Sequence, residues 1–200
     1  VAGIAGNASY NGVAGYGYTL TNNTPGSCGT LYWQLPSINW GSSNEISVKA
    51  SLAANGNADN VAGDGPFMYI GGSTPATTPG APPTSGLGIW VLFYAGAPRI
   101  EVYNGSTIIA SQPLYDPFGT VSNSTFYRTG GYNGNTAWYD LEMVVRRYNG
   151  RAILTVMIND AMIMHTDVSS WAPLGNYCTV GARCGAAYSW NYCRSFEATW

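Results

Sequence analysis

The carboxylates are the first residues whose spacing could support catalysis. Asp140 and Glu142 lie two residues apart in an alternating run, so a β-strand would place both on one face. Glu101 belongs to another alternating run and could stand on a facing strand. Two carboxyl groups about 5–10 Å apart cleave glycosidic bonds. Arg146 and Arg147 follow on the same run as Glu142, so carboxylates that are ion-paired with arginine are the alternative interpretation.

Tryptophan is the second group of residues that could carry function. An exposed indole ring can stack on a sugar ring, whereas a Trp in a fully apolar run packs in a core. Trp90 lies in such an apolar run. Trp40, next to a glycine, and Trp190, in a turn-like segment, are therefore the candidate sugar-binding platforms.

The overall composition excludes several classes of protein. Charged residues make up 9% of the 200 residues and hydrophobic residues 46%, which fits neither a disordered tail nor a coiled coil. Eight Lys and Arg residues, spread thinly, are too few for nucleic-acid binding by phosphate neutralisation. No apolar run is long enough to cross a membrane as a helix, so no transmembrane segment is expected.

The low charge also indicates tolerance of acid. Acid unfolds proteins mainly by protonating carboxylates that have partners in the native state, and only ten carboxylates are present. We therefore expect an acid-stable, extracellular protein, and an archaeal source would suit such a surface.

The N-terminus and the glycosylation motifs favour export. The chain begins at Val1, not Met, so we interpret it as a mature product whose targeting peptide has been removed or is not included in the sequence. Four Asn-x-Ser/Thr motifs occur, although a chain rich in Asn and Thr produces some by chance. The candidate glycosylation sites are Asn7, Asn22, Asn104 and Asn123.

Four cysteines predict two disulfide bonds in an oxidising compartment. A zinc site is the alternative, but no C-x-x-C pair occurs and His165 is distant from the cysteines in sequence. Four cysteines allow three pairings, and the favoured one joins Cys184 to Cys193 and Cys28 to Cys178.

The pattern along the chain is that of an all-β protein. Apolar and polar side chains alternate over residues 46–52, which is typical of a half-buried strand. Asn-Gly pairs, which favour tight turns, predict hairpins over 99–111 and 140–158. No window of ten residues has a convincing helical period, and at most a helical turn near 167–171 is expected. The other expected strands cover 16–20, 30–35, 66–71, 87–95, 124–128, 161–165, 177–183 and 192–200.

About a dozen short strands predict a jelly-roll β-sandwich of two antiparallel sheets. The stretch 71–86 is rich in Pro, Gly, Ser and Thr, and strands flank it closely, so we interpret it as a long surface loop rather than a linker. The expected organisation is an apolar N-terminal segment, 1–12, followed by one β-sandwich domain, 13–200.

Two stretches resemble the L-type lectins of the concanavalin A-like superfamily. Residues 63–70, Gly-Asp-Gly-Pro-Phe-Met-Tyr-Ile, and residues 86–91, Gly-Leu-Gly-Ile-Trp-Val, are similar to the Asp-Gly and Gly-x-Leu-Gly strands of that family. The C-terminal half is also similar, through Trp138, Tyr148-Asn149-Gly150, the run from Leu154 to Asn159, Val180-Gly181-Ala182 and Phe196. The resemblance implies a concanavalin A-like fold over roughly 28–200.

The resemblance transfers few functional residues. It implies that Asp64 contacts sugar, although a turn residue that caps backbone amides is the alternative. The family's metal ions bind carboxylates on the strand that corresponds to residues 91–94, which carry none, so neither a metal nor another cofactor is expected. Residues 139–144 are faintly similar to the nucleophile strand of family-12 endoglucanases, whose remaining motifs are missing.

The N-terminal segment leads to the favoured hypothesis. Residues 1–6 are small, apolar and uncharged. They could add a strand to a neighbouring subunit, with Val1 and Ile4 as the assembly residues, and repeated addition would build a filament. The first strand of the chain's own domain is the alternative role for this segment.

We therefore expect a secreted, non-enzymatic glycoprotein that assembles with copies of itself into an extracellular filament or cell-surface assembly. The alternative is a lectin-like module that binds glycans through Asp64, Trp40 and Trp190. The third hypothesis is a glycoside hydrolase that uses Glu142 with Glu101 or Asp140.

Overall fold

The structure is a computed structural model of the chain. It describes residues 3–22, 24–37, 40–41, 45–56, 65–75, 85–92, 99–113, 127–129, 138–185 and 189–200. These residues form fifteen strands. None of the described residues belongs to a helix long and apolar enough to cross a membrane.

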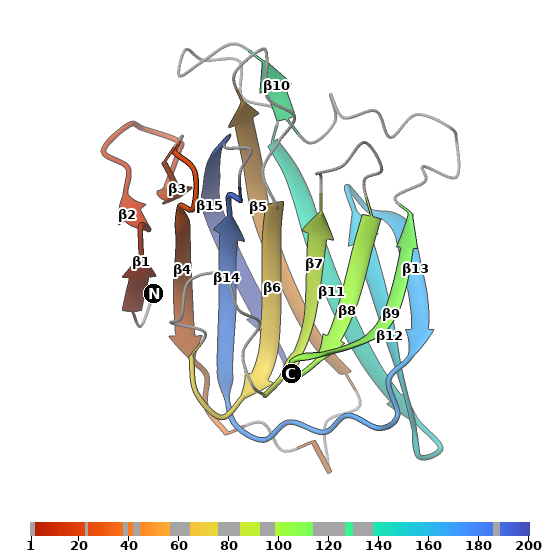
Figure 1. Cartoon of the computed structure of the whole chain (residues 1–200). Coiled ribbons are helices and arrows are strands. Elements are labelled where there is room, and N and C mark those ends of the chain that lie inside the picture. The colour runs from red at the N-terminus through yellow and green to blue at the C-terminus, as the bar shows by residue number, and fades with distance from the viewer. Residues whose placement is uncertain are drawn as a thin grey trace.

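The strands form two sheets that pack face to face, with the seven-stranded sheet in front in Figure 1. Its strand order is β1 (Gly3–Gly6), β4 (Cys28–Gln34), β14 (Tyr177–Arg183), β6 (Gly65–Gly72), β7 (Leu87–Leu92), β8 (Arg99–Asn104) and β9 (Thr107–Pro113). The eight-stranded sheet has the order β13 (Ala161–Asp167), β12 (Arg151–Ile158), β11 (Trp138–Tyr148), β5 (Glu45–Gly56), β15 (Ser189–Thr199), β3 (Tyr18–Thr21) and β2 (Ser9–Tyr10), with β10 (Tyr127–Thr129) pairing in parallel with β5. The predicted all-β sandwich is confirmed.

The alternating run at 46–52 forms the centre of β5, as predicted. Its apolar side chains lie in the core between the sheets, where Ile46, Val48 and Leu52 are essentially inaccessible to solvent. Burying a side chain of this size contributes about 1.5–3 kcal/mol. The polar side chains of the same run, Ser47 and Lys49 among them, point to the outer face, because successive residues of a strand face opposite sides.

Tight turns close the predicted hairpins. Asn149 and Gly150 have φ angles of +49° and +77° between β11 and β12, as an Asn-Gly turn requires. The next hairpin turns through Asn159 and Asp160, also at positive φ, although this pair contains no glycine. The expected helical turn near 167–171 is instead a single turn, in which the Trp171 amide donates to the Val168 carbonyl at 2.8 Å.

The N-terminal segment belongs to both sheets of its own chain. β1 pairs with β4, with Ile4 opposite Leu31, and β2 pairs with β3. Val1 lies outside the described residues. Residues 3–6 therefore form an edge strand of their own domain, which is the alternative role that the sequence allowed for this segment. No described residue supports strand addition to a neighbour or a filament.

The predicted disulfide bonds are not present: none joins the four cysteines, all of which are buried. The register of β4 and β14 excludes the Cys28–Cys178 bond, because Cys28 is opposite Arg183 and Cys178 is opposite Trp33. These positions lie about 16 Å apart along the strands. The Cys193 thiol instead contacts the carbonyl oxygen of Ser195 at 3.5 Å.

Candidate functional site

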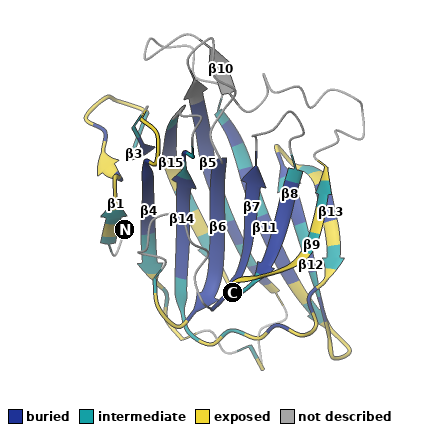
Figure 2. Cartoon of the chain, viewed as in Figure 1, coloured by how far each residue is buried: buried dark blue, intermediate teal, exposed yellow. Residues whose placement is uncertain are grey.

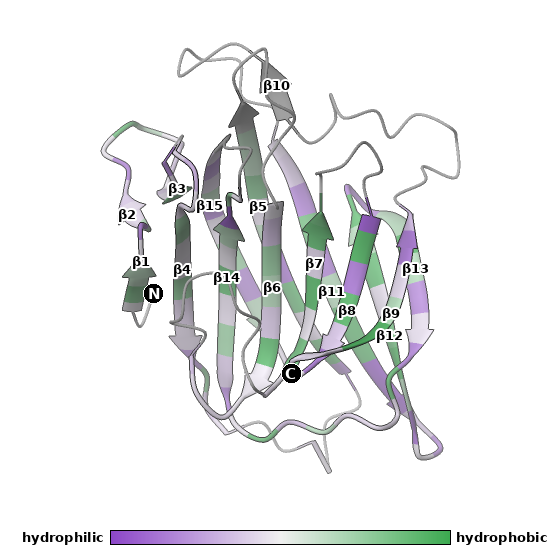
Figure 3. Cartoon of the chain, in the orientation of Figure 1, coloured by the Kyte–Doolittle hydropathy of each residue, from purple (hydrophilic) through white to green (hydrophobic). Residues whose placement is uncertain are grey.

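The central strands of the seven-stranded sheet are buried on both faces. β6 and β7 are buried over their whole length, as Figure 2 shows, and β7 is mostly hydrophobic in Figure 3. Inward side chains such as Met68 and Ile89 belong to the core between the sheets. The outward side chains form a separate cluster, which we call the aromatic face, made of Cys28, Phe67, Tyr69, Trp90, Leu92 and Tyr103.

Glycines on neighbouring strands make room for the aromatic rings. A Cβ atom on Gly88 would lie 2.1 Å from the ring of Tyr69, and one on Gly181 would lie 2.4 Å from Cζ of Phe67. Each ring therefore lies across the adjacent strand, in the space that a side chain would occupy. This packing of an aromatic ring over a cross-strand glycine fixes the position of both rings.

A carboxylate is buried at the edge of the aromatic face. Glu101 is 6% exposed and is the ladder partner of Trp90. Its Oε1 accepts a hydrogen bond from Arg99 Nε at 2.8 Å, and its Oε2 accepts one from the Tyr103 hydroxyl at 2.5 Å. A charge this deeply buried requires such partners, because an unpaired charge in the interior is strongly destabilising.

The beginning of β6 lies beside a second cation. Trp90 Nε1 donates a hydrogen bond to the Gly65 carbonyl at 3.3 Å, and Arg183 is the ladder partner of Gly65. The guanidinium carbon of Arg183 lies 6.0 Å from the centre of the Trp90 ring, which is within the range of a cation–π contact. Asp64, which immediately precedes Gly65 in the sequence, lies outside the described residues.

Two hydroxyl groups of this sheet are buried without a hydrogen-bond partner among the described residues. They are Tyr69 Oη and Thr30 Oγ1. Burial is the main reason that the pKa of the Tyr69 phenol lies well above its usual range, and the neighbouring Tyr103 and Glu101 add to the effect. Buried polar groups are normally satisfied, so these two hydroxyls are exceptions among the described residues.

The structure separates the predicted sugar-binding residues. Trp40 packs edge-on against Trp171, at the end of β6 where Gly71 lies, about 20 Å from the strand's beginning. Trp190 lies on β15 in the other sheet, with its ring parallel to that of Tyr192. Asp64 lies outside the described residues, so its position relative to either Trp, and the proposed sugar site itself, stay predictions.

The structure also separates the predicted catalytic carboxylates. Glu101 faces outward from the seven-stranded sheet, whereas Asp140 and Glu142 face outward from β11 in the eight-stranded sheet. The whole core lies between them, so the expectation that Glu101 faces Glu142 is wrong. Asp140 pairs with Lys49 at 3.4 Å, and Glu142 accepts a hydrogen bond from Ser47 at 3.0 Å.

The two arginines that follow Glu142 in β11 do not pair with the carboxylates of that strand among the described residues. Arg146 pairs with Glu45 at 2.6 Å, and Arg147 donates to the carbonyl of Trp40 at 2.7 Å. Among the described residues, the carboxylates of Asp140 and Glu142 therefore have partners other than these two arginines.

Sequence reasoning missed most of the aromatic face. Arg99, Tyr103 and Arg183 were not predicted as site residues, and Trp90 was assigned to the core. The available signal was the alternation Arg-x-Glu-x-Tyr over 99–103, which places these three side chains on one face of β8.

The described part of this face does not fit a metal site. No three His, Cys, Asp or Glu side chains gather closely enough to hold an ion among the described residues. The charge opposite Leu92 on the ladder is instead the guanidinium of Arg99, already paired with Glu101.

The glycosylation motifs fall at different places on the surface. Asn7 is exposed, whereas Asn22 and Asn104, the last residue of β8, are half-buried. Asn123 lies outside the described residues.

Comparison with known proteins identifies the fold. No model of a known protein family matches the sequence, and no curated protein is similar to it in sequence. Solved structures of lectin domains, in contrast, align with 98% of the chain.

Three of these structures illustrate the likeness. The carbohydrate recognition domain of Emp46p, in its potassium-bound form, has a TM-score of 0.66 at 11% identity over 87% of its length. The legume lectin-like domain from Entamoeba histolytica has a TM-score of 0.64 at 12% identity over 88% of its length. The exoplasmic/lumenal domain of VIP36, in its Ca2+/Man-bound form, has a TM-score of 0.62 at 16% identity over 82% of its length. The chain therefore has the L-type lectin-like, concanavalin A-like fold.

Proposed function

We propose that the chain is a carbohydrate-binding module that binds glycans at the aromatic face, next to Asp64. The observation that carries this proposal is the similarity of 98% of the chain to carbohydrate recognition domains. The VIP36 domains were solved with mannose and with mannose-containing glycans, so mannose-rich glycans are the first class to test.

The chemistry of the aromatic face suits a sugar. A sugar ring has apolar C–H faces and a rim of hydroxyl groups, and binding sites for such molecules combine aromatic walls with a few placed polar groups. Trp90 and Glu101 are themselves buried, and they position the half-buried guanidinium groups of Arg183 and Arg99, which can donate hydrogen bonds to sugar hydroxyls. We assign Asp64, the residue before β6 in the sequence, as a further acceptor for sugar hydroxyls.

Glycan binding also agrees with the predictions of export and glycosylation. A lectin-like module that meets glycans would work outside the cell or in the lumen of the secretory pathway, in keeping with the glycosylation motifs at Asn7, Asn22, Asn104 and Asn123.

A glycan array followed by titration calorimetry tests the proposal. Asp64→Ala should weaken binding of an oligomannose ligand at least tenfold, since a carboxylate that accepts sugar hydroxyls is lost. Asp160→Ala is the matched control, because Asp160 is highly exposed on the other sheet and pairs only with Lys49 among the described residues. A wild-type protein that binds no glycan on the array, or equal affinities for wild type and Asp64→Ala, would overturn the proposal.

A further inference from the structure

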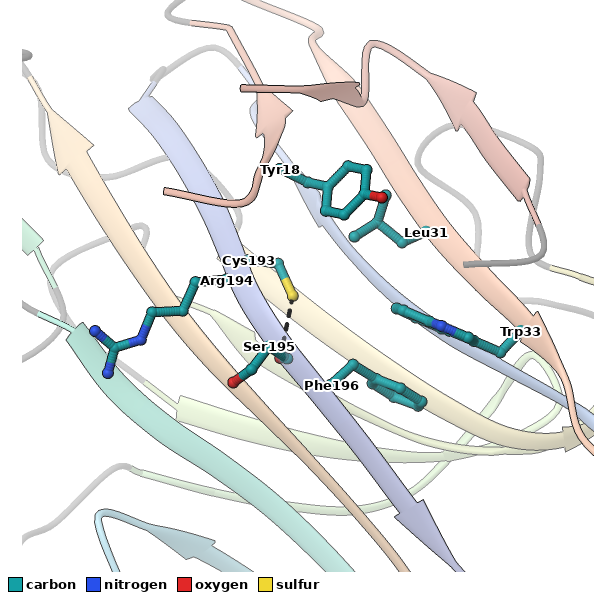
Figure 4. A pocket seen from close by; sticks show the side chains of 7 residues that line it. All are labelled: Tyr18, Leu31, Trp33, Cys193, Arg194, Ser195 and Phe196. Carbon is teal, nitrogen blue, oxygen red and sulfur yellow. Dashed lines mark hydrogen bonds between the residues drawn. The ribbon is translucent and has the colours of Figure 1, made fainter. Parts of the chain in front are cut away.

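A pocket of about 200 Å³ opens between the sheets at the side where β4 faces β3 and β15. Figure 4 shows its lining, which consists of Tyr18, Leu31, Trp33, Cys193, Arg194, Ser195 and Phe196. The pocket lies on the inner side of β4, away from the aromatic face. No residue proposed above for glycan binding lines it.

A bulge in β15 lies at this pocket. The register of β15 against β5 shifts between Cys193 and Ser195, which leaves Arg194 as an extra residue. Gly17 packs against the bulge: a Cβ on Gly17 would lie 2.5 Å from the Cys193 carbonyl oxygen. The bulge is therefore held in place by its neighbour, and the strand does not close over the pocket.

The larger part of the pocket's lining is apolar. The rings of Trp33 and Phe196 stack at 3.8 Å with an angle of 9° between their planes, and they form one wall. Leu31 and Cys193, which are almost completely buried, form the floor. Burial raises the pKa of the Cys193 thiol to about 12, so the sulfur stays neutral at physiological pH.

The charged residue of the lining does not enter the pocket. Figure 4 shows the Arg194 side chain extending from the opposite side of β15. There its guanidinium lies 4.6 Å from the centre of the Trp138 ring, and its Nε donates to Ser51 Oγ at 3.0 Å. Arg194 thus contributes main-chain atoms to the pocket while its charge remains on the outer surface.

From this geometry we infer that the pocket binds a small apolar molecule containing one aromatic ring. A cavity of about 150 Å³ in another protein binds benzene, so this pocket of about 200 Å³ has room for a ring with one small substituent. The Trp33–Phe196 wall offers a flat surface for such a ring, and ring-to-ring contact adds to the gain from burying apolar area. This activity is independent of glycan binding.

Bromobenzene is a suitable probe, because its bromine can be located by anomalous scattering. We expect saturable one-to-one binding to the wild-type chain in titration calorimetry, and bromine density between Tyr18, Trp33 and Cys193 in co-crystals. Cys193→Leu fills the floor of the pocket and should lower the affinity at least tenfold. Cys178→Leu is the matched control, because Cys178 is an equally buried core thiol that does not line the pocket.

Several outcomes would overturn the inference. They are the absence of saturable binding in solution, bromine density elsewhere, density in the crystal without binding in solution, and equal affinities for wild type and Cys193→Leu. If Cys193→Leu does not fold, the position of the bromine in the wild-type crystal and the wild-type calorimetry decide the question together.

Discussion

The outer face of the seven-stranded sheet differs from that of the eight-stranded sheet in both charge and burial. The strands of the seven-stranded sheet carry three charged residues, Arg99, Glu101 and Arg183, beside a buried cluster of rings. Most of the chain's charged residues lie instead on β5, β11, β12, β13 and β15 and on the turns between them.

The pairs on the eight-stranded sheet are exposed. Lys49 lies between Asp140 and Asp160, at 3.4 and 3.7 Å, and Arg151 pairs with Asp167. Exposed pairs of this kind contribute little to stability, because water and salt screen them. The two sheets therefore have different roles. The charged outer face of the eight-stranded sheet keeps the molecule hydrated, while the aromatic face contains the interactions that are costly to break.

The largest expected effect is on the glycines beneath the rings. Gly88→Ala places a methyl group where the Tyr69 ring lies, and that ring is held by Phe67 and Tyr103. We expect a loss of about 3 kcal/mol in the free energy of unfolding, the upper range for overpacking, measured by urea denaturation. Gly12→Ala is the control, since a Cβ there meets nothing within 4 Å. Equal stabilities of the two variants would contradict this account of the aromatic face.

The next effect compares one glutamate from each face. Glu101→Gln leaves Arg99 without its buried counter-charge, and we expect a loss of about 2 kcal/mol. Glu142→Gln keeps an acceptor for Ser47 on an exposed strand and should change stability by less than about 0.5 kcal/mol. Thermal unfolding of both variants measures the difference. If Glu142→Gln were the more damaging change, the division between the faces would be wrong.

The smallest effect concerns the pH dependence of the charged face. Hydrogen bonds from Ser169, together with Arg151, hold the pKa of Asp167 well below its usual range. A carboxylate with a lowered pKa stabilises the native state above its unfolded pKa of about 3.9, and this stabilisation is lost as the pH falls toward the folded value. Asp167→Asn should therefore be less stable than wild type at pH 6, and the gap should narrow below about pH 4. A difference in stability that widens as the pH falls would contradict the lowered pKa of Asp167.

The sequence predicted the strands well where one face is buried and the other is polar. The run at 46–52 and the strands 151–158 and 177–183 were placed correctly, because alternation or a bounding turn marks them. The Asn159-Asp160 turn was not recognised, since without glycine it lacks the strongest signal for positive φ.

The aromatic face could not be predicted in the same way. Residues 66–71 and 87–92 are nearly continuous apolar runs, so periodicity cannot tell the core side from the outer side. Trp90 was correctly expected to be buried, but it lies in the outer cluster rather than between the sheets. The predictions that Glu101 faces Glu142 and that Cys28 bonds to Cys178 were wrong for a related reason. Each prediction depends on which sheet a strand joins and in which register and on which face its side chains lie.

The rings that lie across glycines also constrain how this sequence can change over time. Tyr69 occupies the space beside Gly88, and Phe67 occupies the space beside Gly181. A larger residue at either glycine is compatible with the fold only if the ring opposite becomes smaller in the same lineage. Among relatives of this chain, positions 69 and 88 should therefore vary together, as should positions 67 and 181, while the exposed ion pairs of the other sheet are replaced one residue at a time.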